Sequence, residues 1–302
     1  MVEMPQGDAN RSDSTNKAIR KNNVIDILNL KKNGEKVAAL TAYDYSTSLI
    51  CDKAGIDILL VGDSAAMVVL GYESTIQIGM DEMLVFCKAV SMGTKRAMVV
   101  ADMPFGSYQQ GTSYAIENAI KFIKVGCDAV KLEGGIELVD TIKALVSLGI
   151  PVMGHIGLKP QTSSLWDGYK VQGKTRSSSI KLIEEARELA VAGVFSVVLE
   201  MVTSEVADII SKDLSAVVIG IGSGIGCDGQ VLVLHDMLGL YQDIKPKFVK
   251  RYADLSDSIF HAVLQYSSDV KNGRFPEDQN AFHMSLDEYK EFRKIVEKDG
   301  ED

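Results

Sequence analysis

Short, continuously apolar segments alternate with segments of helical periodicity from residue 37 onward. Unbroken apolar runs are typical of strands that are covered on both faces, as in a parallel sheet. Between the runs, apolar residues recur at helical spacing, for example at 116, 119, 120 and 123, and a glycine follows as a stop. The predicted strands are 37–43, 57–62, 97–102, 129–133, 151–156, 195–200 and 216–222, with an eighth at 230–235.

This order of elements predicts an α/β protein with a closed (β/α)8 TIM barrel. No room for a helix remains between residues 222 and 230, so the last repeat is expected to be irregular, and an open doubly wound sheet is the structural alternative. After Pro246 we expect helices outside the barrel, with Ser285 and Glu288 as a capping box. The predicted division is a disordered polar tail at 1–20, a barrel catalytic domain at 21–270 and a C-terminal helical extension at 271–302.

Composition excludes several kinds of partner. The chain has 32 Lys and Arg against 41 Asp and Glu, which gives a net charge of −9. Nucleic acids and anionic membranes need a basic surface, so neither is expected to bind. We find no apolar run approaching the roughly 20 residues of a transmembrane helix. The four cysteines are far apart and the first 20 residues lack an apolar signal region, which predicts a cytoplasmic protein.

Two segments match nucleotide-binding patterns by letter. Residues 224–229 fit G-x-G-x-x-G and residues 168–175 fit G-x-x-x-x-G-K-T. The first pattern requires a helix to follow and the second requires a buried strand to precede. Strand-like residues follow the first and a polar segment precedes the second, so we interpret both as chance matches.

Acidic residues stand where several of the predicted strands end. Asp63 follows the second predicted strand, Asp102 and Glu133 stand at the ends of the third and fourth, and Glu200 ends the sixth. Active sites of such barrels lie at the carboxyl ends of the strands, and neighbouring strands are only about 4.8 Å apart. Any one Asp there could simply cap a helix. Three together predict a cation site, and an all-oxygen set favours Mg²⁺.

Two basic residues share this rim. Lys131 lies two positions before Glu133, so both side chains point to the same side of the strand. An inward Lys either pairs with a barrel carboxylate or binds a substrate carboxylate, and the residues alone leave both roles open. His155 lies near the end of the fifth strand, where we assign it a supporting role.

Six segments carry a resemblance to a known family. They are 61–75, 101–108, 130–135, 152–161, 171–174 and 219–239, for example VGDSAAMVVLGYEST and IGIGSGIGCDGQVLVLHDMLG. In this order they resemble the ketopantoate hydroxymethyltransferase family, also called 3-methyl-2-oxobutanoate hydroxymethyltransferase. The resemblance implies an enzyme with a (β/α)8 barrel and Mg²⁺. It would transfer a hydroxymethyl group from 5,10-methylenetetrahydrofolate to 3-methyl-2-oxobutanoate through a Mg-stabilised enolate, giving 2-dehydropantoate for pantothenate and coenzyme A biosynthesis. A homodecamer is also implied.

The resemblance also implies a role for each rim residue. Asp63 and Asp102 would bind Mg²⁺ directly, and Glu133 would hold it directly or through water. Ser64 and Lys131 would bind the 2-oxo acid, together with the two aspartates, and Glu200 would accept the proton. The alternative enzyme is a Mg-dependent lyase or mutase of the phosphoenolpyruvate mutase/isocitrate lyase type, whose K-K-C-G-H loop is missing here. The alternative that is not an enzyme is a non-catalytic barrel that serves as a binding or scaffold subunit. Loss of Asp63, Asp102 or Glu200 would support it, but all three acids are present.

Overall fold

The computed structural model describes residues 20–162, 168, 170–243 and 246–298. The chain divides into two compact units, a barrel unit that ends at Arg251 and a C-terminal unit that starts at Tyr252. Most of the polar tail predicted at 1–20 lies outside the described residues. The boundary predicted between residues 270 and 271 lies within the C-terminal unit, one residue before the end of a helix.

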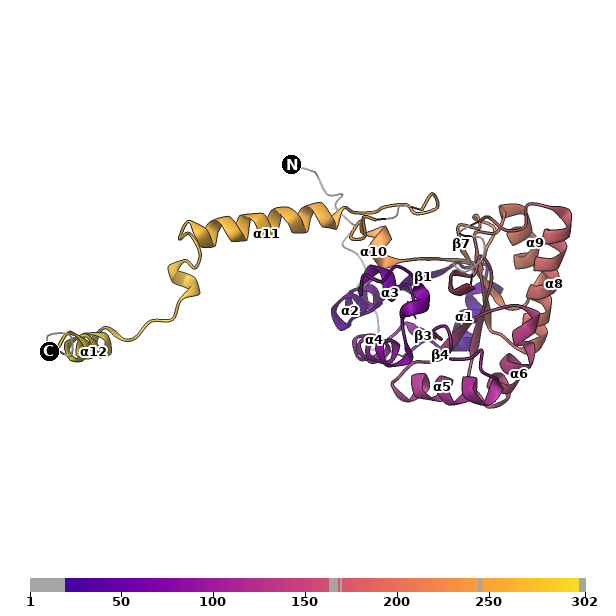
Figure 1. The fold of residues 1–302 in the computed structure, drawn as a ribbon, viewed down its shortest axis with the longest axis horizontal. Coiled ribbons are helices and arrows are strands. Elements are labelled where there is room, and N and C mark those ends of the chain that lie inside the picture. The colour runs from indigo at the N-terminus through magenta and orange to yellow at the C-terminus, as the bar shows by residue number, and fades with distance from the viewer. Residues whose placement is uncertain (1–19, 163–167, 169, 244–245, 299–302) are drawn as a thin grey trace, which may run out of the picture. The chain divides into compact units, whose positions relative to one another are not determined.

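Eight parallel strands close into a barrel in the order of the sequence, which confirms the predicted fold (Figure 1). Every predicted strand is present, most of them with slightly shorter bounds. The strands are β1 Val37–Thr41, β2 Ile58–Val61, β3 Met98–Asp102, β4 Ala129–Glu133, β5 Val152–Gly157, β6 Ser196–Glu200, β7 Val217–Ile221 and β8 Gly229–Leu232.

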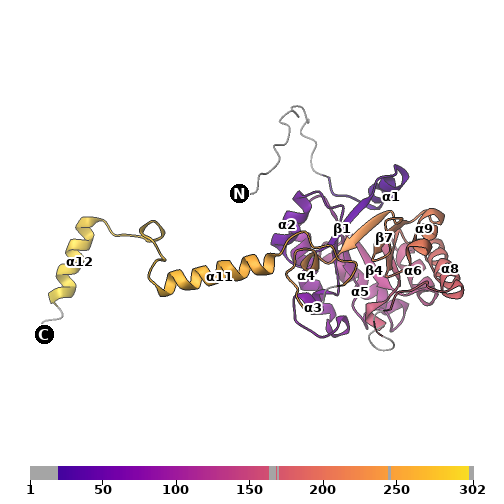
Figure 2. The same cartoon turned by 90° about the horizontal axis from the view of Figure 1, so that it is seen from above.

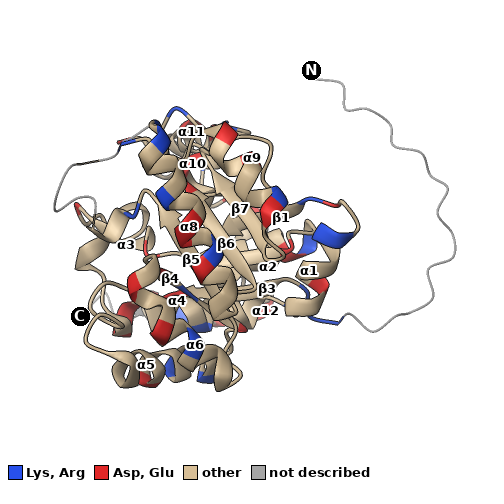
Figure 3. Ribbon diagram, turned by 90° about the vertical axis from the view of Figure 1, so that its right-hand side faces the viewer, with Lys and Arg blue, Asp and Glu red and all other residues tan. Residues whose placement is uncertain are grey.

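Helices surround the strands and cover their outer faces (Figure 2). The helical spacing at residues 116–123 belongs to α5 Thr112–Lys124, and the helices after the next two strands are α6 Val139–Ser147 and α8 Arg176–Ala192. The last of these ends on Gly193, whose φ of 98° suits glycine. The other helices of the barrel unit are α2 Tyr45–Lys53, α3 Ala65–Val68, α4 Met80–Gly93 and α9 Ser204–Asp213, with the 3-10 turns η1 Thr75–Gln77 and η2 Ile136–Leu138. Basic and acidic residues are interspersed along this outer layer (Figure 3).

The twofold alternation of the strands decides which side chains enter the barrel. One buried cluster, which fills the interior, contains Met98 and Val100 of β3, Ala129 of β4, Met153 of β5 and Val198 of β6. Two residues further along each of these strands stand Asp102, Lys131, His155 and Glu200. The alternate residues, such as Val99 and Leu132, belong to a second cluster that packs against the helices. The same alternation therefore places the predicted site residues inside the carboxyl end of the barrel.

The last repeat is irregular, as predicted, because residues 222–228 join β7 to β8 without a helix. A strand begins at Gly229, where the nucleotide-binding pattern requires a helix, which agrees with a chance match. The predicted eighth strand, 230–235, was wrong at its end, since α10 occupies Leu234–Met237. The Leu234 backbone N–H donates to Thr41 Oγ1 at 3.0 Å and thereby turns the chain out of the sheet.

An additional helix, α1 Val24–Lys32, precedes β1 and was not predicted. Asn23 caps it with its side chain, which accepts from the backbone N–H groups of Ile25 and Asp26. Its Ile27 is fully buried in the cluster that fills the barrel interior. Lys31 Nζ donates to the carbonyl of Ala216 at 2.9 Å and contacts Asp228 Oδ2 at 2.7 Å. Because Ala216 directly precedes β7, α1 closes the amino-terminal end of the barrel.

We expect Ile27→Ala to lower the free energy of unfolding by about 2–5 kcal/mol, because it opens a cavity in a fully packed interior. Ile25 lies on the same helix but is 66% exposed, so Ile25→Ala should change stability by no more than about 0.5 kcal/mol. Urea unfolding followed by circular dichroism measures both. Equal effects of the two variants would contradict a packing role for α1.

The C-terminal unit contains α11 Leu255–Lys271, the 3-10 turn η3 Asp278–Asn280 and α12 Leu286–Lys298. The predicted capping residue is in place, since the Glu288 backbone N–H donates to Ser285 Oγ at 3.3 Å. None of the residues of α11 is buried. In the ranges that the structure describes, no helix is both long and apolar enough to cross a membrane.

Candidate active site

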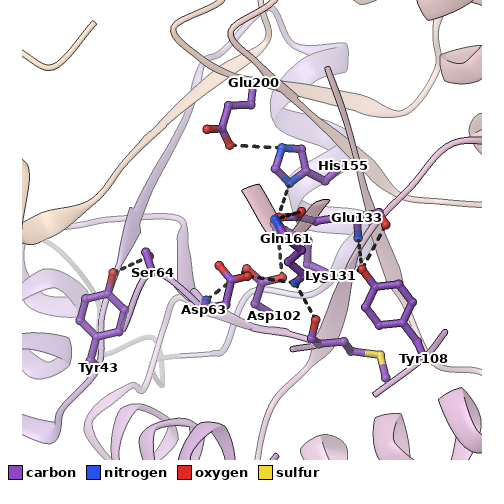
Figure 4. Close-up of polar contacts among 11 residues, drawn as sticks. Tyr43, Asp63, Ser64, Asp102, Tyr108, Lys131, Glu133, His155, Gln161 and Glu200 are labelled. Carbon is purple, nitrogen blue, oxygen red and sulfur yellow. Dashed lines mark hydrogen bonds and ion pairs between the residues drawn. The ribbon is translucent and has the colours of Figure 1, made fainter. Parts of the chain in front are cut away.

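A cavity of about 360 Å³ opens among the carboxyl ends of the strands. All the site residues predicted from the sequence line it, and Figure 4 shows how they converge. They are Asp63, Ser64, Asp102, Lys131, Glu133, His155 and Glu200. Their convergence follows from the register, which aligns Asp102 with Lys131 and Glu133 with His155 on neighbouring strands.

Three carboxylates form the floor of this cavity. Asp63, Asp102 and Glu133 are buried, and each offers one oxygen that lies within 4.8 Å of the others. The backbone N–H of Asp63 donates to Asp102 Oδ2 at 3.3 Å, which fixes the end of β2 against the end of β3. Carboxylates this close repel one another unless a positive charge lies between them.

Lys131 supplies part of that charge. Its Nζ lies 2.6 Å from Asp102 Oδ1 and 3.6 Å from Glu133 Oε1, and the side chain is buried. Burial alone would lower the pKa of Lys131, but the charges of Asp102 and Glu133 outweigh it and raise the pKa. Lys131 is therefore a buried ammonium that is tied to the acidic cluster.

The pKa shifts of the three acids show that their charge is only partly balanced. Burial, followed by repulsion from Asp102 and Glu133, raises the pKa of Asp63 well above its usual value. Burial also raises the pKa of Asp102, despite the charge of Lys131. For Glu133 burial acts in the same direction, but His155 and Lys131 outweigh it and lower the pKa to about 2. The unbalanced negative charge is centred on Asp63 and Asp102.

His155 links this cluster to the fourth acid. Its Nδ1 lies 3.2 Å from Glu133 Oε1, and its Nε2 lies 3.3 Å from Glu200 Oε2. Burial lowers the pKa of His155, but the charge of Glu133 and the contacts with both glutamates raise it to about 9. The side chain of Glu200 is 15% exposed, whereas that of Glu133 is 2% exposed. Glu200 is thus held at the cavity wall through His155, apart from the three acids.

Three further residues of the site were missed by the sequence reasoning. Gln161 is fully buried, and its Nε2 donates to Asp63 Oδ2 at 2.9 Å, while its backbone N–H donates to Glu133 Oε2 at 3.1 Å. Tyr108 donates to Gln161 Oε1 at 2.7 Å, and Tyr43 shares a hydrogen bond of 2.8 Å with Ser64. Tyr108 and Gln161 each end one of the six family segments, which was the only signal for them.

The donor set fits a hard cation such as Mg²⁺. An octahedral magnesium ion holds oxygens at about 2.1 Å, so its ligands lie up to about 4 Å apart, close to the spread of the three acids. In the part of the chain that the structure describes, no group donates to Asp63 Oδ1. Both oxygens of Glu133 are engaged by protein groups, which favours contact with a cation through water.

Comparison with known proteins places the chain in a family. A model of the family described as ketopantoate hydroxymethyltransferase matches residues 21–278. The chain belongs to this family. A protein of Nitrosopumilus maritimus strain SCM1, named 3-methyl-2-oxobutanoate hydroxymethyltransferase, is 56% identical over 90% of this chain and 98% of its own length. A protein of the same name from Cenarchaeum symbiosum is 53% identical over 85% of this chain and 97% of its own. The family and its enzymatic nature, both predicted from the motifs, are confirmed.

Solved structures with the same fold are much more distant in sequence. Phosphoenolpyruvate phosphomutase from Streptomyces platensis has a TM-score of 0.57 at 14% identity and covers 93% of this chain and 98% of its own. A phosphonopyruvate hydrolase, solved in complex with oxalate and Mg²⁺, has a TM-score of 0.55 at 10% identity and covers 92% of this chain and 97% of its own. At these identities the likeness shows only the barrel fold. It gives no support to the alternative activity of a lyase or mutase.

Proposed function

We propose that this protein transfers a hydroxymethyl group from 5,10-methylenetetrahydrofolate to 3-methyl-2-oxobutanoate in a Mg²⁺-dependent reaction. The product would be 2-dehydropantoate, which leads to pantothenate and coenzyme A. The observation that carries the proposal is the cavity in which Asp63, Asp102 and Glu133 meet, with Glu200 held apart from them by His155. The names of the family and of the relatives support 3-methyl-2-oxobutanoate as the acceptor, and the folate donor is what the family resemblance implies.

The acids divide into two roles in this proposal. Asp63 and Asp102 would hold the cation directly, and Glu133 would hold it through water. When bound, Mg²⁺ would stabilise the negative charge that develops on the keto oxygen as a proton leaves C3. Glu200 accepts that proton, since it faces the cavity and is not engaged with the other three acids. His155 orients Glu200 and is a positioning residue.

Two other side chains bind the 2-oxo acid. Lys131 attracts its carboxylate, while Asp102 holds the ammonium in place at 2.6 Å. The Ser64 hydroxyl is oriented by Tyr43, so its position is set before the acid binds. Such preorganised contacts lower the cost of bringing C3 close to Glu200.

The direct test is an assay of the purified protein with 3-methyl-2-oxobutanoate, 5,10-methylenetetrahydrofolate and Mg²⁺. Mass spectrometry should detect 2-dehydropantoate, and EDTA should abolish its formation. A parallel reaction with phosphoenolpyruvate, followed by ³¹P NMR, tests the mutase alternative. Formation of phosphonopyruvate without 2-dehydropantoate would overturn the proposal.

Lys131→Met separates substrate binding from cation binding. We expect the variant to retain Mg²⁺ affinity but to raise the KM for the 2-oxo acid, because one charge-assisted contact worth about 1.5–3 kcal/mol is lost. Steady-state kinetics and calorimetry with Mg²⁺ measure the two quantities. A variant with normal kinetics would show that Lys131 only balances charge inside the barrel.

Assembly and location are also proposals. We propose a cytoplasmic homo-oligomer, a decamer by family resemblance. The four cysteines are buried and free, which is consistent with a reducing compartment. Exposed apolar residues on α11, among them Ile259, Phe260, Val263 and Leu264, support burial against another subunit. Size-exclusion chromatography with light scattering measures the assembly.

A further inference from the structure

A fifth carboxylate, that of Asp236, lines the same cavity and has no role in the reaction as proposed. Asp236 belongs to α10, which directly follows β8, so strand β1 separates it from Asp63 along the rim. The hydrogen bond from the Leu234 backbone to Thr41 fastens α10 to β1. The neighbouring His235 packs on Tyr43, with ring centroids 5.3 Å apart. The position of Asp236 in the cavity wall is therefore fixed.

This carboxylate is not paired within the protein. Across the described ranges, no group makes a hydrogen bond or an ion pair with the Asp236 side chain. The nearby Arg251 guanidinium instead donates to the carbonyl of Tyr241 at 3.4 Å and to Gln242 Oε1 at 3.3 Å. Burial raises the pKa of Asp236 to about 6, although the charge of Arg251 opposes the shift. A partly buried, unpaired acid in a cavity wall is expected to meet donors on a ligand.

The surroundings of Asp236 suit a flat, neutral ring. Val233, Tyr241 and Phe248 line the cavity with it. Phe248 packs directly on the backbone of Gly222, where an added Cβ would lie 2.9 Å from its ring. Pro246 and Lys247 also line this part of the cavity, so it is mostly apolar and aromatic, with Lys247 as a cation and Asp236 as its carboxylate acceptor. The 2-oxo acid is an anion, and Asp236 would repel it.

Of the two proposed substrates, the folate has the matching donors. Its pterin carries an N3–H and a 2-amino group side by side on the pyrimidine ring, and this pair of donors fits the two oxygens of a carboxylate as a guanidinium does. We propose that Asp236 binds the 2-amino-4-oxopyrimidine ring of the folate co-substrate through these two hydrogen bonds. The inference rests on the proposed function and adds the side chain that would recognise the one-carbon donor.

The test compares Asp236→Asn with Asp243→Asn, which makes the same change at an exposed acid in the next segment of the chain. Calorimetry measures the binding of tetrahydrofolate in the presence of Mg²⁺ and 3-methyl-2-oxobutanoate. Asparagine presents one acceptor and one donor, so we expect Asp236→Asn to bind tetrahydrofolate about 10- to 150-fold more weakly. The control should bind it as the wild type does. A 2-desamino-2-methyl analogue of tetrahydrofolate should bind almost equally to Asp236→Asn and wild type.

A second measurement separates a loss of folate binding from a loss of the chemistry on the 2-oxo acid. Exchange of the C3 hydrogen of the 2-oxo acid with deuterated water needs no folate, so Asp236→Asn should exchange at the wild-type rate. Unchanged affinity for tetrahydrofolate, equal losses for the folate and its analogue, or loss of C3 exchange would each overturn the role of Asp236. Failure of the wild type itself to bind tetrahydrofolate would instead overturn the proposed function, and this inference with it.

Discussion

Glu200→Gln is expected to slow exchange of the C3 hydrogen of 3-methyl-2-oxobutanoate by about 10²–10⁴-fold, the usual cost of losing a general base. The amide keeps the shape of the side chain and an oxygen that can face His155 Nε2, which lies 3.3 Å from Glu200. Binding of Mg²⁺ and the 2-oxo acid should remain near normal, because Glu200 does not contact the three clustered acids. Proton NMR in deuterated water follows the exchange directly.

Glu205→Gln is the matched control, since Glu205 is an exposed acid near the start of α9. It should exchange the hydrogen at the wild-type rate. A wild-type rate in Glu200→Gln would show that another group takes the proton, and His155 would be the next residue to test.

Asp63→Ala is expected to weaken Mg²⁺ binding by about 10²-fold or more. Loss of a residue that only hydrogen-bonds to a metal ligand already lowers metal affinity by about 10–100-fold, and loss of a ligand should cost more. Binding of the 2-oxo acid and its C3 exchange should be lost together with the cation. The thermal midpoint gives an independent reading. Mg²⁺ should raise the Tm of the wild type, because a ligand that binds only the folded state stabilises it, and should leave the Tm of the variant unchanged.

Asp208→Ala controls for the loss of an acid, since Asp208 pairs with Lys212 on the exposed face of α9. Its response to Mg²⁺ should equal that of the wild type. If Asp63→Ala keeps its affinity for the 2-oxo acid and EDTA has no effect on the wild type, the acidic cluster does not act as a cation site.

The strand-based part of the site could be predicted because alternation is a local property. The end of each apolar run indicates where its strand ends. The register of the parallel strands then brings together the residues at these ends, which are Asp102, Lys131, Glu133, His155 and Glu200. The same logic gave the barrel and its irregular last repeat. The fold and the set of clustered acids therefore needed no information beyond the order of residues.

The parts that could not be predicted depend on contacts between distant segments. Gln161 reaches Asp63 from the segment after β5, and Tyr43 reaches Ser64 from the segment after β1. No periodicity marks such residues. The eighth strand ends early because Thr41, from the opposite end of the barrel sequence, accepts from the Leu234 backbone. The helix α1 was missed for a similar reason, because its contacts are with the amino-terminal end of the barrel, which is built from distant segments of the chain.

Because β1 pairs with β8, the barrel cannot close until the ribosome has made the eighth strand. Val37 pairs with Gly229, and Lys31 of α1 is held by groups around Ala216 and Asp228. At about 5–20 residues per second, the ribosome needs on the order of 10–40 s to make the chain between these partners. Throughout that interval the first strand has one open edge and Ile27 has no completed interior to enter. Nascent chains of this protein therefore pass through a long stage in which an apolar strand edge is exposed to other chains, the kind of edge that chaperones protect.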